Sequence, residues 1–352
     1  MNADSPPVTL AQRLQQAWLT RDALAYALLP LAALFLAVTV VRRGLYRIRW
    51  LRAHRVSIPV IVVGNLIAGG AGKTPTVIAI VAALRRHGYT PGIVSRGYGV
   101  PIEGLLDVTR NLPAAHCGDE PLLLHLRTGA PVVVGRDRVG TARHLLRQHP
   151  AVDVIVSDDG LQHLALARDV QVLVFDERGA GNGWLLPAGP LREPLPRGVP
   201  PRTLVLYNAA VASTPLPGTL ARRSLAGVVT LADWWQGQPA SMVALEALRG
   251  RPLIAAAGLA RPQRFFEMLR DCGLTITPRP LPDHHGYATL PWPANVAGVV
   301  VTEKDAIKLG VERIGATPVW VAPLDFTFDA AFEAALIALL PSSGTRYGNT
   351  PA

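Results

Sequence analysis

The chain has 352 residues, 49% of them hydrophobic, which is enough for one large domain or two ordinary ones with a sizeable core. Its two cysteines, Cys117 and Cys272, exclude a disulfide framework and indicate a reducing compartment. The formal net charge is +10, but residues 1–56 hold +6 of it beside an apolar segment, so the basic excess favours an anionic membrane surface and argues against a nucleic-acid partner.

An uncharged run, ALAYALLPLAALFLAVTVV, occupies residues 23–41 and is followed by the basic segment RRGLYRIRWLR. Its length is just enough to cross a hydrocarbon core, and Pro30 would kink such a helix without forbidding it. A cleaved signal peptide fits poorly, because no small-residue cleavage site follows. We predict a membrane anchor in residues 1–55. It either spans the bilayer or lies in the interface with Tyr46 and Trp50 at headgroup level, and it places the rest of the chain in the cytoplasm.

Downstream of the anchor, short apolar strands alternate with helices. VSIPVIVVGN (56–65) has the composition of a buried strand, and TPTVIAIVAALRRHG, from Thr74, that of a helix that stops at Gly88. Further strand-like runs lie at 92–95, 131–134, 152–159, 170–176 and 203–208. Continuous apolar strands with helices between them indicate an α/β fold built on a doubly wound parallel sheet.

The composition changes at residues 178–202, a Gly- and Pro-rich stretch that we expect to form a long loop near the site. A second set of strands and helices begins near residue 226 and ends in a helix at about 328–340. We therefore predict one domain over 56–225, a smaller C-terminal α/β domain over 226–341, and a disordered tail at 342–352.

The segment VVGNLIAGGAGKTP, residues 62–75, ends like a phosphate-binding loop, but Ile67 stands where the signature G-x-x-x-x-G-K-[ST] has glycine. Gly64 is the candidate for the turn that the missing glycine would make. Three glycines before Lys73 supply backbone freedom, and Lys73 is one of only three lysines beside 32 arginines. The alternative is a Gly-rich turn that caps a helix. We predict a nucleotide site formed by Ile67, Ala68, Gly69, Gly70, Ala71, Gly72, Lys73 and Thr74.

A P-loop needs a second strand that ends in an acid for Mg²⁺. VDVIVSDDGLQH supplies Asp158 and Asp159 at the end of an apolar strand, and Thr74 would ligate the metal through its hydroxyl. Which aspartate contacts Mg²⁺ directly stays open. The alternative is a pair of capping residues at a strand end.

Five other polar clusters stand out: SRGYG (95–99), CGDEP (117–121), LREP (191–194), DHHGY (283–287) and TEKDAIK (302–308). Taken singly, each has an ordinary structural interpretation. Asp119 would cap the helix that follows it, and His284 would be a loop histidine.

Taken together and in order, VVGNLIAGGAGKTP, SRGYG, GDEP, RTGAPVVV, SDDGLQH, LLPAGPLREP, PDHH and VTEKDAIKL resemble the tetraacyldisaccharide 4′-kinase family, the lipid A 4′-kinases of Gram-negative bacteria. The resemblance covers about residues 20–340, and the departures from it, such as Ala71, are minor. It implies a P-loop three-layer α/β/α domain joined by a hinge to a smaller C-terminal α/β domain. It also implies an ATP- and Mg²⁺-dependent kinase at the cytoplasmic face of the inner membrane. Such a kinase phosphorylates the 4′-hydroxyl of a lipid A disaccharide precursor, tetraacyldisaccharide 1-phosphate, to give lipid IVA.

By the same resemblance, Asp119 matches the general base of the family and His284 matches the histidine that supports this base. A sugar hydroxyl is a poor nucleophile, so an aligned carboxylate would help to remove its proton, while Lys73 and Mg²⁺ offset charge on the transferred phosphoryl group. We place Asp119 and His284 in different domains, so domain closure would assemble the site and exclude water. The other residues that match the metal, substrate and active-site motifs of the family are Asp158, Asp159, His163, Arg96, Tyr98 and Glu193, of which we count Glu193 among the metal ligands.

Two other functions are compatible with parts of the sequence. A membrane-bound P-loop ATPase without a sugar acceptor would use the divergent loop but has no need of an acceptor base. A basic nucleic-acid binder would carry a stripe of basic and aromatic residues, which this chain lacks. Phosphorylation of a disaccharide lipid would separate these functions.

Overall fold

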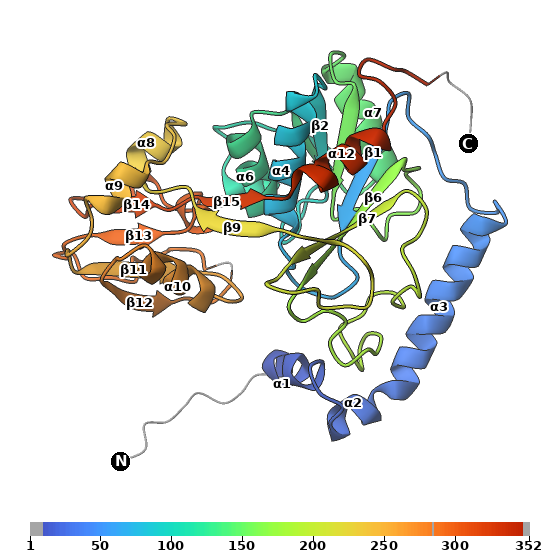
Figure 1. The fold of residues 1–352 in the computed structure, drawn as a ribbon, viewed down its shortest axis with the longest axis horizontal. Coiled ribbons are helices and arrows are strands. Elements are labelled where there is room, and N and C mark those ends of the chain that lie inside the picture. The colour runs from blue at the N-terminus through green and yellow to red at the C-terminus, as the bar shows by residue number, and fades with distance from the viewer. Residues whose placement is uncertain (1–9, 284, 348–352) are drawn as a thin grey trace.

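The computed structural model of this chain describes residues 10–283 and 285–347, which form two sheets with helices packed around them (Figure 1). The larger sheet has eight strands in the order β3-β4-β2-β5-β1-β6-β7-β8. All neighbours run parallel except β3, which is antiparallel to β4 at one edge. The strands are β1 (Val60–Gly64), β2 (Pro91–Ser95), β3 (Leu105–Val108), β4 (Val132–Gly135), β5 (Val154–Asp158), β6 (Val170–Asp176), β7 (Thr203–Asn208) and β8 (Thr219–Leu220).

Helices cover both faces of this sheet, as the predicted doubly wound fold requires. In β1, Ile61 and Val63 belong to one hydrophobic cluster, while Val60 and Val62 belong to another, because successive side chains of a strand point to opposite faces. The first cluster includes residues of α4 and α6, and the second includes residues of α7. The helices between the strands of this sheet are α4 (Lys73–Arg86), α5 (Ala114–Cys117), α6 (Asp119–Thr128) and α7 (Arg138–Gln148).

The smaller sheet has five strands in the order β10-β14-β13-β11-β12, all parallel except β10 at one edge. Its strands are β10 (Val229–Thr230), β11 (Leu253–Ala257), β12 (Ile276–Pro280), β13 (Val299–Val301) and β14 (Val319–Val321). The helices around it are α8 (Leu231–Trp235), α9 (Met242–Glu246), α10 (Gln263–Asp271), α11 (Glu303–Ala306) and the 3₁₀ helix η1 (Val311–Arg313).

A two-stranded antiparallel ribbon of β9 (Arg222–Leu225) and β15 (Leu324–Thr327) carries the chain between the two domains (Figure 1). The closing helix α12 (Ala330–Ala338) then lies on the larger domain, and not in the C-terminal domain where the sequence analysis puts it. The hydroxyl of Tyr89 donates to the carbonyl of Pro341 at 2.6 Å, and Arg202 donates to the carbonyl of Leu339 at 2.6 Å. The reason is that β15 returns the chain to the larger domain, where Phe332 of α12 is buried.

The first part of the expected tail also packs on the larger domain. The backbone N–H of Tyr347 donates to the carbonyl of Ser57 at 2.6 Å, and its hydroxyl donates to Asp169 at 3.1 Å. The guanidinium of Arg55 lies 4.9 Å from the centre of the Tyr347 ring. Residues 342–347 are therefore placed by specific contacts, contrary to the expected disorder, and residues 348–352 lie outside the described residues.

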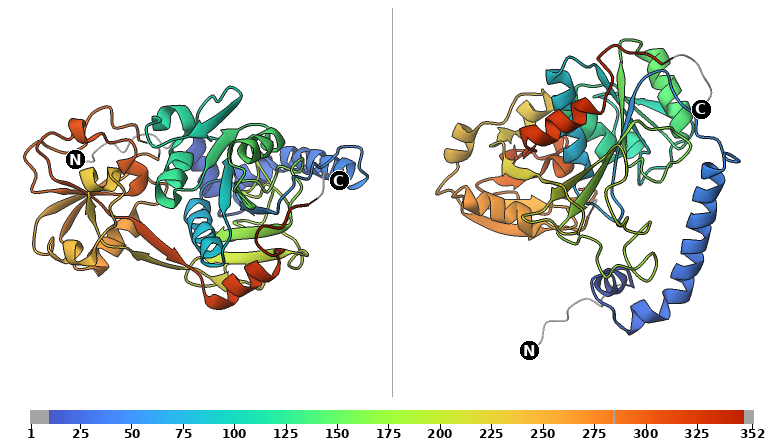
Figure 2. Two further views of the ribbon diagram at one scale, coloured as in Figure 1. Left: turned by 90° about the horizontal axis from the view of Figure 1, so that it is seen from above. Right: turned by 45° about the vertical axis from the view of Figure 1, so that its right-hand side comes forward.

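The apolar N-terminal run forms two helices instead of one. Asp22 caps α2 (Ala23–Ala27), Leu28 separates the two, and Pro30 lies in the first turn of α3 (Leu29–Arg47), where its missing N–H costs nothing. Within the described residues, α3 is the one helix that is long and apolar enough to cross a membrane. Only 6% of its most apolar 18-residue stretch is buried. Figure 1 and the right-hand view of Figure 2 show α3 running along the outside of the larger domain.

Candidate nucleotide and acceptor site

The loop between β1 and α4 has the backbone shape that its glycines predict. Gly69 and Gly72 adopt φ values of +91° and +89°, in the left-handed region that side chains disfavour. At Gly72 a side chain is also excluded by space, since an added Cβ would lie 1.9 Å from Nδ2 of Asn208. Gly70 has an ordinary φ and open space around it, so the loop conformation requires two of the three glycines.

The first residues of the predicted phosphate loop serve the fold instead. Ile67 is fully buried and pairs with Leu191, and the N–H of Ala68 donates to the carbonyl of Pro190 at 2.7 Å. Gly64, our candidate for the missing turn, lies within β1, where an added Cβ would sit 2.7 Å from Cβ of Leu161. The part of the loop that is available to phosphate therefore begins at Gly69, because Ile67 and Ala68 are engaged with the loop around residue 190.

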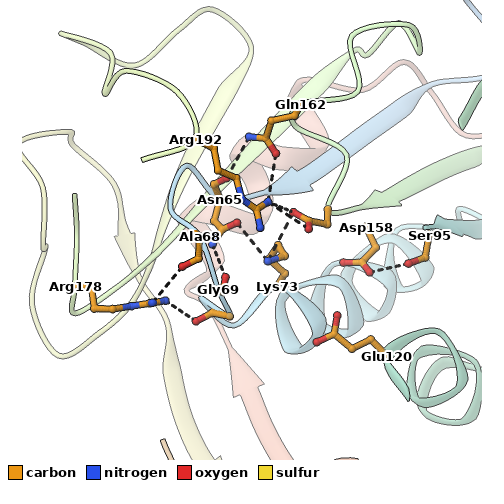
Figure 3. A network of polar contacts seen from close by, with 12 residues as sticks. Asn65, Ala68, Gly69, Lys73, Ser95, Glu120, Asp158, Gln162, Arg178 and Arg192 are labelled. Atoms are coloured by element: carbon orange, nitrogen blue, oxygen red, sulfur yellow. Dashed lines mark hydrogen bonds and ion pairs between the residues drawn. The ribbon is translucent and has the colours of Figure 1, made fainter. Parts of the chain in front are cut away.

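Lys73 is the first residue of α4, and its side chain is almost fully buried. Its ammonium donates to Oδ1 of Asn65 at 3.3 Å (Figure 3). It also lies 3.7 Å from Oδ1 of Asp159. The amide of Asn65 in turn donates to the carbonyl of Gly69 at 3.0 Å. One asparagine thus connects the lysine to the loop that it serves.

Asp158 is the last residue of β5, beside β1, Asp159 follows it, and the two differ in their surroundings. Asp158 is buried and accepts from the hydroxyl of Ser95 at 3.0 Å through Oδ2, while its Oδ1 has no hydrogen-bond partner among the described residues. Burial raises the pKa of Asp158 to about 7, and the nearby carboxylates of Glu120 and Asp159 add to the shift. Asp159 is part-exposed and pairs with Lys73 and with Arg192, at 3.2 Å from the latter.

Two arginines that the sequence analysis does not single out contribute to the site: Arg178 holds the phosphate loop, and Arg192 pairs with Asp159. Arg178 follows β6, pairs with Asp176, and donates to the carbonyls of Ala68 at 3.2 Å and Gly70 at 2.7 Å (Figure 3). Arg192 precedes Glu193 in the LREP segment, and its guanidinium donates to Oδ1 of Asp159 at 3.2 Å. In a chain with 32 arginines, the sequence alone offers no signal that separates these two from the others.

Ion pairs between the domains hold the residues that we predict for the acceptor side. Asp119 is the first residue of α6, and its Oδ2 lies 2.8 Å from the ammonium of Lys308. The next residue, Glu120, pairs with Lys304 at 2.6 Å. All three lysines of the chain therefore contact predicted site residues or their neighbours. Because lysine is so rare in this sequence, its presence at positions 304 and 308 is the feature that could have pointed to these residues. His284 lies outside the described residues.

The remaining predicted site residues differ in how far they are buried. Burial and the neighbouring Arg138 and Arg96 lower the pKa of His163 to about 4, so its imidazole is neutral at pH 7. Arg96 and Tyr98 are exposed after β2, and Tyr98 keeps 74% of its surface. Glu193 is buried, pairs with Arg43 of α3, and has its pKa raised mainly by burial.

A cavity of about 1040 Å³ lies between the two domains. The P-loop from Ala68 to Thr74 forms one part of its wall, Glu120 lines it from α6, and Lys304 lines it from the smaller domain. Figure 3 shows Lys73, Asp158 and Glu120 around the start of α4. Side chains from both domains therefore line the same cavity as the P-loop.

Comparison with known proteins points to one family. Residues 24–341 match the model of the LpxK family, described as tetraacyldisaccharide-1-P 4′-kinase. A protein from Methylibium petroleiphilum named tetraacyldisaccharide 4′-kinase is 58% identical over 99% of this chain and 100% of its own. A protein of the same name from Leptothrix cholodnii is 55% identical over 95% of this chain and 97% of its own. A crystal structure of LpxK from Aquifex aeolicus in complex with ATP is similar in fold, with a TM-score of 0.75 and 26% identity, and covers 90% of this chain and 100% of its own.

Proposed function

The chain belongs to the tetraacyldisaccharide-1-P 4′-kinase family, and from this premise we propose that it transfers the γ-phosphoryl group of ATP to the 4′-hydroxyl of tetraacyldisaccharide 1-phosphate, giving lipid IVA in lipid A biosynthesis. The observation that carries this proposal is that one cavity is lined both by the P-loop lysine, Lys73, and by Glu120, the neighbour of the candidate base Asp119. A P-loop ATPase without an acceptor has no need of that second set of groups.

Lys73 and the start of α4 would hold the phosphates. The backbone N–H groups of Gly69 to Thr74 and the helix N-terminus attract anions, and the Lys73 ammonium adds a full charge. Asn65 and Asp159 keep this ammonium in place before the nucleotide binds.

The residues around Asp158 fit a divalent cation. A buried carboxylate oxygen without a hydrogen-bond partner among the described residues is costly, and it is the kind of donor that Mg²⁺ prefers. Asp158 would hold the ion with the hydroxyl of Thr74, while Asp159 is occupied by Lys73 and Arg192. Bound there, Mg²⁺ would neutralise charge on the β- and γ-phosphates.

Asp119 would act as the general base, with His284 supporting it. The 4′-oxygen attacks the γ-phosphorus, its proton passes to the Asp119 carboxylate, and the bond from the γ-phosphorus to the β,γ-bridging oxygen breaks to release ADP. Lys308 lies on the other domain and contacts the carboxylate, so the relative position of the domains sets that of the base. The ribbon of β9 and β15 joins the domains and would serve as the hinge.

The α3 helix would attach the protein to the inner membrane with the site on the cytoplasmic face. Leu31, Leu34, Val38 and Val41 share one face of α3, and each keeps more than half of its surface exposed. The apolar part of α3, before Arg42, is about 20 Å long at about 1.5 Å per residue, against a hydrocarbon core of ~30 Å. We therefore favour insertion along one interface, where an acyl-chain substrate resides, over spanning.

The experiment that tests this function measures ADP formation with and without the lipid acceptor. Purified full-length protein in mixed micelles should form ADP in step with phosphorylated disaccharide, and should form little ADP when the tetraacyldisaccharide is left out. ADP formation at the same rate without acceptor would favour the ATPase instead.

A further inference from the structure

The N-terminal helix α1 (Leu10–Ala17) and the turn after it lie at the mouth of the nucleotide cavity. The match to the family model begins at residue 24, after this helix. Gln15, Gln16, Trp18 and Leu19 nevertheless line the same cavity as the P-loop. Figure 1 shows α1 beside the loops that follow the strands of the larger sheet.

This position is held by a set of buried hydrogen bonds. The side-chain amide of Asn182 donates to the carbonyls of Ala17 at 3.0 Å and Thr20 at 3.1 Å, and its backbone N–H donates to the carbonyl of Trp18 at 2.8 Å. The indole N–H of Trp18 donates to the carbonyl of Pro187 at 2.8 Å. Ala17 is fully buried in this contact.

The loop after β6 is shaped to receive this turn. Gly181 has a φ of +59°, and an added Cβ would lie 2.6 Å from the carbonyl oxygen of Trp18. A side chain at this position would displace the turn. The contact between α1 and the loop therefore depends on a glycine as well as on Asn182.

The sheet order places α1 on the side where the base of a nucleotide must lie. The acids Asp158 and Asp159 lie at the end of β5 and directly after it, on one side of β1, whereas the loop that holds α1 follows β6, on the other side. A γ-phosphate directed toward Asp158 leaves the ribose and base on the far side of the P-loop, over the ends of β6 and β7. Asp176 and Asn208, at these strand ends, line the cavity together with α1.

We propose that residues 15–19 form a wall of the ATP site that contacts the base and ribose. Gln15 and Gln16 supply amide donors and acceptors of the kind that recognise the polar edge of a base, and Trp18 and Leu19 supply apolar surface. The wall lies before the residues that the family model matches, and it acts on the nucleotide and not on the lipid acceptor.

Two ligands that share phosphates but differ in the base provide the test. Binding of ADP and of inorganic triphosphate is measured by calorimetry on the full-length protein and on the Gln15→Ala/Gln16→Ala variant. The Kd for ADP should rise about fivefold, because two base contacts are lost, while the Kd for triphosphate should stay within twofold. Arg13→Ala, an exposed change on the same helix, is the matched control and should leave both values unchanged.

Deletion of residues 1–19 provides a second, stronger variant that keeps α2 and α3. It should raise the Kd for ADP further and leave the KM for the lipid acceptor unchanged. Equal weakening of ADP and triphosphate would overturn the proposal, because α1 would then act through the P-loop. A rise in the lipid KM with unchanged ADP binding would also overturn it, and would assign the wall to an acyl chain. Because ADP binding is measured directly, the result does not depend on which acceptor the enzyme phosphorylates.

Discussion

The ammonium of Lys308 lies 2.8 Å from Oδ2 of Asp119, and the two residues belong to different domains. Their side chains are only 10% and 17% exposed, so solvent screens this pair less than a surface ion pair. The contact fixes the carboxylate that we assign as the base and reports on whether the two domains are together. It makes Lys308 a positioning residue that can be tested apart from the base itself.

Replacing Lys308 by alanine should lower kcat for the lipid acceptor by up to about 100-fold, because a misplaced base loses alignment with the hydroxyl. The KM for ATP should stay within twofold, since Lys308 does not contact the P-loop. Lys308→Arg should recover part of kcat. Steady-state kinetics with both substrates varied gives these values. The control is Glu333→Ala, which removes the ion pair with Arg86. A normal kcat for Lys308→Ala would show that Lys308 does not position the base.

Replacing Lys73 by alanine should reduce phosphoryl transfer by at least ~100-fold, the usual cost of losing one charged group that stabilises the transition state. The fold should persist, because the Lys73 ammonium contacts Asn65 and Asp159 and not the hydrophobic core. Circular dichroism establishes folding, and a radiolabelled transfer assay measures the rate. Near-normal transfer by the folded variant would contradict the P-loop assignment.

Asp158 predicts a pH dependence of stability in the protein without nucleotide or metal. Burial raises the pKa of Asp158 to about 7 from an unfolded value near 3.8, so between these values the folded state holds a proton that the unfolded state has lost. The contribution of this group to stability is therefore present below about pH 4 and is lost as the pH rises to about 7.

Asp158→Asn should remove the loss of stability that the wild type shows as the pH rises to about 7, because asparagine does not ionise. In EDTA, the Tm of the variant should rise relative to the wild type as the pH goes from 5 to 7.5, while its kinase activity disappears. The control is Asp271→Asn, a change at an exposed aspartate. Parallel pH profiles for the wild type and Asp158→Asn would show that Asp158 is ionised in the folded protein throughout this range.

The exposed face of α3 predicts membrane binding. Leu34→Glu/Val38→Glu should reduce co-sedimentation with vesicles that contain anionic lipid, since two apolar contacts become charges that the interface disfavours. Val211→Glu/Val243→Glu adds the same charge at equally exposed apolar sites elsewhere and should bind like the wild type. Equal binding by all three proteins would place the anchor outside α3.

The sequence predicts the parts of this fold that rest on local pattern. The apolar runs at β1, β5 and β6 and the Gly-rich loop before Lys73 carry their own periodicity and turn chemistry, and each forms the predicted element. The place of α12 could not be predicted, because it depends on β15 returning the chain to the larger domain. The contacts of Tyr347 with Asp169 and Ser57 could not be predicted either, since the polar composition of the tail does not reveal its tertiary partners.

The candidate site shows the same division. Lys73, Asp158 and Asp159 follow from a motif in which sequence spacing fixes spatial spacing. Arg178 holds the P-loop across 110 residues of sequence, and nothing in its neighbourhood along the chain indicates this role. The break between α2 and α3 was open to prediction, because Asp22 is a helix cap and Pro30 is favoured in a first turn, but the uncharged run suggested one helix.

The most direct test of the central claim is the position and rate of phosphate transfer by the wild type and by Asp119→Asn. Full-length protein in mixed micelles receives γ-labelled ATP, Mg²⁺ and tetraacyldisaccharide 1-phosphate, and the product is analysed by mass spectrometry and phosphorus NMR. The account predicts a bisphosphorylated disaccharide with the new phosphate on the 4′-oxygen. It also predicts that Asp119→Asn lowers kcat by about 100-fold or more while ATP still binds. Phosphate on another hydroxyl, ATP hydrolysis without transfer, or an undiminished kcat in Asp119→Asn would contradict it.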